Sequence, residues 1–190
     1  MPTIVVFHSA LGRRPAVEAL ATTLRADGHE VVTPDLFDGR VLDDLDAGVA
    51  ERDRIGIPEL IDRALAAVED LPGEVAYVGL SMGTGPAQLL ATTRPGARGA
   101  ALVQGALPLE AIGVERWPSS VPLQLHTSPG DPWQDEESTG LLLDHVPPAL
   151  REHHEYPGCG HLFMDPGLPA HDPHATDALI AALRAWLARI

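Results

Sequence analysis

The chain has 190 residues, 45% of them hydrophobic, with 27 acidic side chains against 13 basic ones. This length allows one domain with a substantial buried core and leaves little room for two, so we expect residues 1–190 to form a single domain. The formal net charge of −14 at pH 7 would repel nucleic acids and anionic lipids, so neither is an expected partner.

The N-terminal segment lacks the features of a targeting signal. It runs from Met1-Pro2-Thr3 directly into the apolar run Ile4 to Phe7, without the basic region and long apolar region of a signal peptide. No stretch approaches the roughly 18 consecutive apolar residues of a transmembrane helix. A single cysteine, Cys159, excludes an internal disulfide and fits a reducing compartment. These features predict a cytoplasmic protein that does not contact a membrane.

A strand and a helix are predicted at the N-terminus. The apolar run Ile4 to Phe7 has the pattern of a buried strand, and a loop over His8 to Arg14 follows it. Pro15 and the apolar spacing after it predict an amphipathic helix that ends near Gly28. Glu30 to Thr33 then has the pattern of a second strand. The loop therefore lies at the carboxyl end of the first strand of a βα unit.

The segment from 35 to 57 is irregular and acidic. So long a connection inside a compact domain is usually functional or disordered, and we interpret it as a pocket wall with a helical turn or two. Pro58 then opens a helix with a clear apolar stripe, and Leu71-Pro72-Gly73 is expected to end that helix.

The centre of the chain contains a Gly-x-Ser-x-Gly motif, Gly79-Leu80-Ser81-Met82-Gly83, between a predicted strand and a predicted helix. Val75 to Val78 is the buried strand, and the helix opens at Pro86. In a nucleophile elbow the serine lies at the bend, and its neighbours two positions away are small because strand and helix crowd each other. The N–H of Met82 would then face a developing negative charge. The alternative is an ordinary glycine-rich turn.

The rest of the chain continues to alternate between strand and helix. Predicted strands cover Ala100 to Val103, Val121 to His126 and Glu152 to Tyr156; a weak helix covers Glu137 to His145, and a final helix starts at Asp172-Pro173. This alternation predicts a parallel sheet with helices on both faces and a site at the carboxyl edge of the sheet.

A serine nucleophile needs a histidine base and a carboxylate that orients the base. Asp131 follows a late strand and His161 follows the last strand, in the chain order that hydrolases of this fold use. Asp131 could instead be a turn aspartate that bonds its own backbone, and Asp135 is the rival acid. The remaining histidines give no metal-ligand spacing, so we expect no metal and no cofactor. Cys159 has no elbow around it and is better explained as a small packing residue.

The second oxyanion donor should come from the loop after the first strand, where the Ala10 N–H is the candidate. His8 in the same loop could be a strand-end histidine that bonds the backbone. Four large side chains are candidates for the substrate pocket, although each could equally belong to the core: Phe37, Trp133, Phe163 and Met164.

Together these motifs resemble the dienelactone hydrolase family of α/β-hydrolases, over nearly the whole chain. The matching segments are the oxyanion loop, the segment after the next strand, the elbow, the acid turn and the histidine turn: His8-Ser9-Ala10-Leu11-Gly12, Pro34-Asp35-Leu36-Phe37-Asp38-Gly39, Gly79-Leu80-Ser81-Met82-Gly83, Gly130-Asp131 and Tyr156-Pro157-Gly158-Cys159-Gly160-His161-Leu162-Phe163. The resemblance implies a Ser81, Asp131 and His161 triad with Met82 and Ala10 as backbone oxyanion donors. It also implies hydrolysis of a small lactone or ester without a metal.

Two features differ from the best-known members of that family. Those members carry a cysteine in the elbow and a glutamate in the first loop, where this chain has Ser81 and Ser9. They also bind the substrate carboxylate with arginines, and the sequence assigns that role to none of the arginines considered, which are Arg13, Arg14, Arg52 and Arg54.

The sequence therefore predicts a minimal, cap-free α/β-hydrolase, a three-layer sandwich around a mainly parallel sheet of about six strands. We expect it to cleave a small carboxylic ester or lactone through an acyl-serine intermediate, as a monomer or a homodimer. A thioesterase or other acyl hydrolase is one alternative, and a small-molecule binding module without turnover is another.

Overall fold

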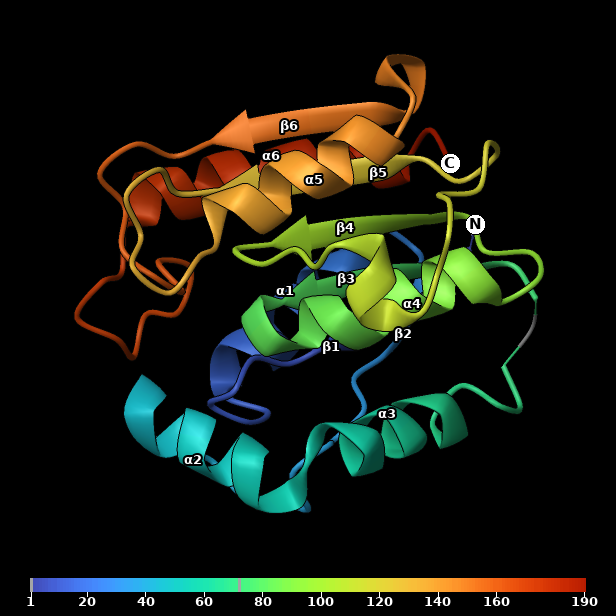
Figure 1. The fold of residues 1–190 in the computed structure, drawn as a ribbon. Helices are drawn as coiled ribbons and strands as arrows, with labels where there is room; N and C mark the ends of the chain where they lie inside the picture. Colours follow the sequence, from blue (N-terminus) through green and yellow to red (C-terminus); the bar gives the residue numbers. More distant parts are fainter. Residues whose placement is uncertain (1, 72) are drawn as a thin grey trace.

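A computed structural model describes residues 2–71 and 73–190; Met1 and Pro72, which was expected to help end a helix, lie outside the described residues. Six strands form one sheet in the order β2-β1-β3-β4-β5-β6, and every neighbouring pair is parallel (Figure 1). The strands are β1 (Thr3–Phe7), β2 (Glu30–Val32), β3 (Val75–Leu80), β4 (Gly99–Val103), β5 (Leu123–Thr127) and β6 (Arg151–Glu155). The prediction of a mainly parallel sheet of about six strands is confirmed.

Helices cover both faces of this sheet (Figure 1). They are α1 (Pro15–Ala26), α2 (Leu45–Ile55), α3 (Ile57–Ala66), α4 (Thr84–Thr93), α5 (Glu136–His145) and α6 (Pro173–Leu187). The apolar sides of α1 and α6 pack on one face, and those of α3, α4 and α5 pack on the other. The result is the predicted three-layer sandwich.

The strand sequences explain why both faces are covered. In β1, Ile4 and Val6 belong to the core cluster under α1 and α6, while Val5 and Phe7 belong to the cluster under α3 and α4. Because successive side chains of a strand point to opposite faces, an apolar run must be buried on both. The five residues of β1 are accordingly all buried.

The strand order fixes where a site can form. The chain passes from β1 to β2 on one side of β1 and then returns to place β3 on its other side. Loops leaving the carboxyl ends of β1 and β3 therefore diverge, which opens a crevice at that point of the sheet. Phe7 at the end of β1 is in register with Gly79 near the end of β3. The Ala10 loop and Ser81 consequently begin side by side.

The acidic segment from 35 to 57 contains more helix than the sequence indicated. In place of one or two turns, it forms the 11-residue α2, whose N-terminus is capped by the Asp44 side chain. On its inner side Glu51 is buried and accepts hydrogen bonds from Arg54 and Arg40. The bonds from Arg54, and then from Arg40, lower the pKa of Glu51 to about 2.

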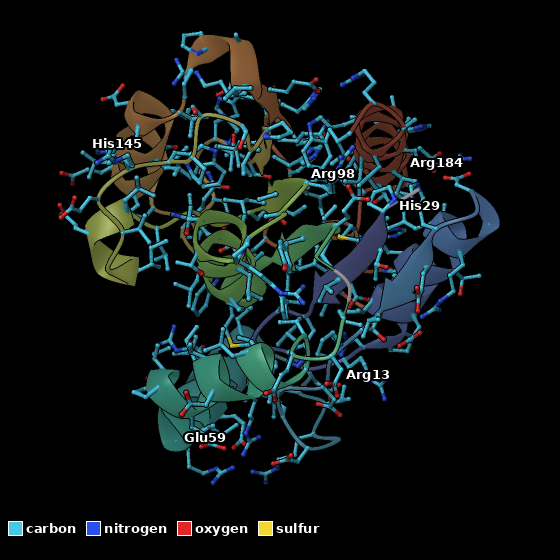
Figure 2. The ribbon with its side chains drawn as sticks, turned by 90° about the vertical axis from the view of Figure 1, so that its right-hand side faces the viewer. Arg13, His29, Glu59, Arg98, His145 and Arg184 are labelled. Atoms are coloured by element: carbon cyan, nitrogen blue, oxygen red, sulfur yellow. The ribbon has the colours of Figure 1, made fainter. Side chains whose placement is uncertain are left out.

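Charged side chains mark the outer surface of the helices (Figure 2). Arg184 of α6 donates two hydrogen bonds to Asp27 at the end of α1, and Glu59 on the outer side of α3 accepts one from Arg63. Within residues 2–71 and 73–190, every helix is too short or too polar to cross a lipid bilayer.

Candidate active site

Ser81 lies at a sharp bend between β3 and α4. Its φ is +51°, a left-handed conformation that non-glycine residues rarely adopt. A Cβ at Gly79 would come 2.4 Å from the Gly83 carbonyl oxygen, and a Cβ at Gly83 would come 2.4 Å from the Phe7 carbonyl oxygen. The backbones of β1, β3 and the elbow are thus packed so closely that both positions require glycine. This is the crowding that the motif predicts.

Ser81, His161 and Asp131 form a hydrogen-bonded chain. The distance from Ser81 Oγ to His161 Nε2 is 2.8 Å, and the distance from His161 Nδ1 to Asp131 Oδ2 is 2.6 Å. A carboxylate only accepts hydrogen bonds, so the imidazole proton lies on Nδ1, and Nε2 accepts from the serine hydroxyl. The side chains of His161 and Asp131 are 4% and 0% exposed, which shields the pair from water. The structure therefore brings the three predicted residues together in the expected order.

The Asp131 carboxylate has further partners that fix its orientation. Oδ1 accepts from the Trp133 N–H at 3.0 Å, and Oδ2 also accepts from Gln104 Nε2 at 3.3 Å. The rival acid, Asp135, caps α5 instead and accepts from the Ser138 hydroxyl and backbone. Those bonds lower the pKa of Asp135. In this arrangement Asp131 is the carboxylate bonded to the histidine.

Gln104 is a site residue that sequence reasoning missed. It directly follows β4, is 1% exposed, and adopts a φ of +53°. Its Nε2 donates to Ser128 Oγ and the Gly160 carbonyl, both at 2.9 Å, and its Oε1 accepts from the Leu162 N–H at 2.6 Å. The amide therefore joins the acid loop to the histidine loop. A buried strand ending in a polar residue at the carboxyl edge was the signal that could have identified it.

The loop that carries Ala10 is held in place by the segment before α2 and by α2 itself. A Cβ at Gly48 of α2 would come 2.4 Å from the Ala10 carbonyl oxygen. The Leu42 N–H donates to the Leu11 carbonyl at 3.0 Å, and Arg14 donates to the Leu42 carbonyl and to Asp165 in the histidine loop. Segment 40–48 thus fixes the backbone whose N–H is the expected oxyanion donor.

His8, at the start of the same loop, has a structural role. His8 is fully buried; its Nδ1–H donates to the Ser9 carbonyl at 2.7 Å, and its Nε2 accepts from the Leu36 N–H at 2.9 Å. Burial lowers the pKa of His8, consistent with a neutral ring. His8 is therefore the backbone-bonded histidine that was the alternative interpretation for it.

Cys159 packs against the core, and burial raises the pKa of its thiol.

A cavity of about 520 Å³ opens over Ser81, and its walls include Ala10, Met82, Trp133 and His161. The Trp133 ring centroid is 6.4 Å from that of His161. The first N–H groups of a helix have no intrahelical acceptor, so the Met82 N–H is available at this wall.

Three predicted pocket residues lie elsewhere. Phe37, Phe163 and Met164 are 1%, 0% and 5% exposed and belong to the two hydrophobic core clusters, so they do not line this cavity. Their large apolar side chains are covered by the helices and loops around them. The ring centroids of Phe163 and Tyr156, for example, are 5.0 Å apart. For these three positions the core alternative is the correct one.

The histidines other than His161, all within the described residues, do not gather into a metal site. Across the described parts of the chain, 2–71 and 73–190, no three His, Cys, Asp or Glu side chains are grouped so that they could hold a metal ion. His153 instead pairs with Thr127, and His154 stacks on His126.

A parallel sheet of this strand order, with a serine elbow after β3 and a bonded acid and histidine after later strands, defines an α/β-hydrolase. The model of the dienelactone hydrolase family matches residues 1–190, and the chain belongs to this family of hydrolases.

Solved structures with the same fold are similar to the chain over nearly its full length. A dienelactone hydrolase-like promiscuous phosphotriesterase from metagenomic libraries has a TM-score of 0.77 at 20% identity, covering 100% of this chain and 86% of that one. A putative dienelactone hydrolase from Klebsiella pneumoniae gives 0.75 at 16% identity, with 100% and 88% covered. A cold-adapted esterase from an Arctic intertidal metagenomic library gives 0.62 at 21% identity, with 95% and 82% covered. A search of curated protein sequences found no significant match.

Proposed function

We propose that the protein is a serine hydrolase that cleaves a small carboxylic ester or lactone through an acyl-Ser81 intermediate. The observation that carries the proposal is the bonded chain from Ser81 Oγ through His161 to Asp131, with distances of 2.8 Å and 2.6 Å. Its family, and the esterase named among its structural neighbours, give independent support.

In the first half of the reaction, Ser81 Oγ attacks the carbonyl carbon while His161 Nε2 takes the hydroxyl proton. The carbonyl oxygen becomes an oxyanion, which the Met82 and Ala10 N–H groups stabilise at the start of the helix and in the first loop. The tetrahedral intermediate then collapses: the bond to the alcohol breaks, and His161 gives its proton to the departing oxygen. An acyl group remains on Ser81.

In the second half, His161 takes a proton from water, and the resulting hydroxide attacks the acyl carbon. The second intermediate collapses to release the acid, and the proton returns to Ser81. Asp131 keeps the imidazole in the Nδ1–H tautomer and stabilises the imidazolium, while Trp133 N–H and Gln104 hold the carboxylate. No step of this mechanism requires a metal or a cofactor.

A serine alcohol is far less acidic than the cysteine thiol of the best-known family members, so it depends on the base at every turnover. The short contact between Ser81 and His161 supports this dependence. We therefore propose that every turnover uses the Ser81 hydroxyl, activated by His161. A thiolate nucleophile, as in the cysteine-containing members, takes no part.

Labelling with a fluorophosphonate probe tests the proposal. The wild-type protein should take up one label, which peptide mass spectrometry should locate on Ser81, and Ser81→Ala should take up none. Hydrolysis of 4-nitrophenyl acetate should fall in Ser81→Ala by roughly 10³-fold or more, because the triad acts as a unit. An unlabelled wild-type protein would favour a binding module without turnover.

A further inference from the structure

The walls of the cavity over Ser81 are rich in apolar side chains, and three helices contribute several of them. Leu45 and Val49 come from α2, Leu60 and Ile61 from α3, and Leu89 from α4. Such a wall offers close contact but no hydrogen bonds. Transfer of a substrate group from water to this surface is therefore favourable only if that group is apolar. The helices α2 and α3 thus supply apolar surface that a substrate would contact beyond the triad.

The polar side chains of this wall outside the triad already have partners within the protein. Arg52 donates to Asp53 at 2.8 Å, Thr84 donates to a carbonyl of the elbow at 2.7 Å, and Ser138 donates to Asp135 at 2.7 Å. The Gln104 amide bonds to the acid and histidine loops. A charged substituent buried against the apolar side chains would lose its hydration, and most polar groups near it are already bonded within the protein.

The apolar surface continues to the opening of the cavity. Ile57, Leu107 and Trp133 are 54%, 36% and 43% exposed, and all three line the cavity. Large apolar side chains that gather at a solvent-exposed opening are typical of a ligand-binding surface. Interior and opening therefore favour the same kind of ligand.

We infer that the substrate is a neutral ester or lactone with an apolar chain of several carbons, which lies against α2, α3 and α4 in this cavity. This inference rests on the proposed function, since it assumes that Ser81 is the nucleophile. It differs from recognition of a carboxylate-bearing substrate, because the cavity wall carries the Asp135 carboxylate as well as Arg52, and Arg52 is paired with Asp53.

The wild-type protein tests the inference with two ester series. One comprises 4-nitrophenyl acetate, butanoate, hexanoate and octanoate, and the other comprises acetates of alkan-1-ols of the same lengths. In at least one series, kcat/KM should rise by up to about fourfold per added methylene until the cavity is filled. A 4-nitrophenyl monoester of adipic acid, which carries a carboxylate at the chain end, should react at least tenfold more slowly than the hexanoate.

Variants of the cavity wall test where the alkyl chain of the substrate binds. Ile61→Trp and Val49→Trp fill the cavity from α3 and α2, and each should lower the octanoate-to-acetate ratio of kcat/KM by at least tenfold. Leu65→Trp is the matched control: Leu65 lies one turn after Ile61 on α3, is 41% exposed, and is outside the cavity. This variant should keep the wild-type ratio.

The outcomes separate this inference from the proposed function. Flat rates in both series, a faster reaction with the adipate monoester, or an unchanged ratio in both cavity variants would overturn the inference while acetate cleavage and the label on Ser81 remained. If no ester is cleaved and Ser81 takes no label, the proposed function fails and the inference fails with it.

Discussion

Gln104 offers a sharp test of how the site is held together. Gln104→Leu keeps a side chain of similar size but removes an amide that bonds Ser128, Asp131, Gly160 and Leu162. The Leu162 N–H would remain buried without an acceptor, and the Gly160 carbonyl would lose its donor. At roughly 1–3 kcal/mol for each of these two unsatisfied groups, we expect the free energy of unfolding to fall by about 2–6 kcal/mol.

The variant should also lower activity, because the same amide spans the loops of the acid and the base. A displacement of the imidazole by about 1 Å can cost on the order of 10²-fold in rate. We expect kcat for 4-nitrophenyl butanoate to fall by roughly 10- to 100-fold with little change in KM, since the apolar side chains of α2, α3 and α4 in the wall are unchanged. Urea unfolding and steady-state kinetics on the same preparation measure both effects.

Gln124→Leu is the matched control. Gln124 is another fully buried glutamine, bonded to His126, Glu152 and the Ala182 carbonyl between β5, β6 and α6. It should lose comparable stability and keep kcat at a temperature where it is folded. If Gln104→Leu keeps wild-type kcat, or if Gln124→Leu loses as much kcat, the amide of Gln104 does not position the triad.

Three further predictions concern individual contacts. Gly83→Ala should lower the free energy of unfolding, measured with urea, by about 1–3 kcal/mol or more, because its Cβ would overlap backbone oxygens at the end of β1. Gly140→Ala in α5 is the control: its Cβ would meet open space, and the change should be neutral or stabilising. Asp131→Asn should lower kcat/KM by about 10²- to 10⁴-fold by favouring the wrong imidazole tautomer, and Asp135→Asn should change it only a few-fold, because asparagine also caps a helix. Burial lowers the pKa of His126 to about 3, whereas the same side chain in the unfolded protein takes up a proton near pH 6.5. The free energy of unfolding should therefore fall as the pH drops below about 6.5. This fall should be smaller in His126→Phe.

Each of these predictions has a result that would contradict it. A fully stable Gly83→Ala would mean that the backbones around the elbow are not so close. A larger loss of kcat/KM in Asp135→Asn than in Asp131→Asn would move the acid to Asp135. Thermal unfolding of wild type and His126→Phe with the same dependence on pH between about 6.5 and 5 would exclude His126 as a source of that dependence.

The core of the site could be predicted from the sequence because it follows from short-range chemistry and chain order. Glycines two residues from Ser81, a buried strand before it and a helix after it leave few arrangements other than an elbow. Asp131 and His161 follow strands whose carboxyl ends must share one edge of a parallel sheet. Their positions relative to Ser81 are therefore set by topology.

Other features depend on tertiary contacts that no local pattern encodes. The buried residues of α2 are Gly48 and Glu51 rather than an apolar stripe, and the helix packs on the Ala10 loop through Gly48. Whether Phe37 or Phe163 lies in the core or in a pocket depends on which helix covers it. Gln104 was missed because a single buried polar residue at a strand end takes its meaning only from the loops that meet there.

The most direct test of the mechanism is to trap the acyl-enzyme. Wild-type protein mixed with 4-nitrophenyl butanoate and quenched in acid should show a burst of about one 4-nitrophenol per active site and an intact mass increased by one butanoyl group, which peptide mapping should place on Ser81. Ser81→Ala should show neither. Turnover by Ser81→Ala at the wild-type rate, or a butanoyl group mapped to another residue of the wild-type protein, would contradict the assignment of Ser81 as the nucleophile.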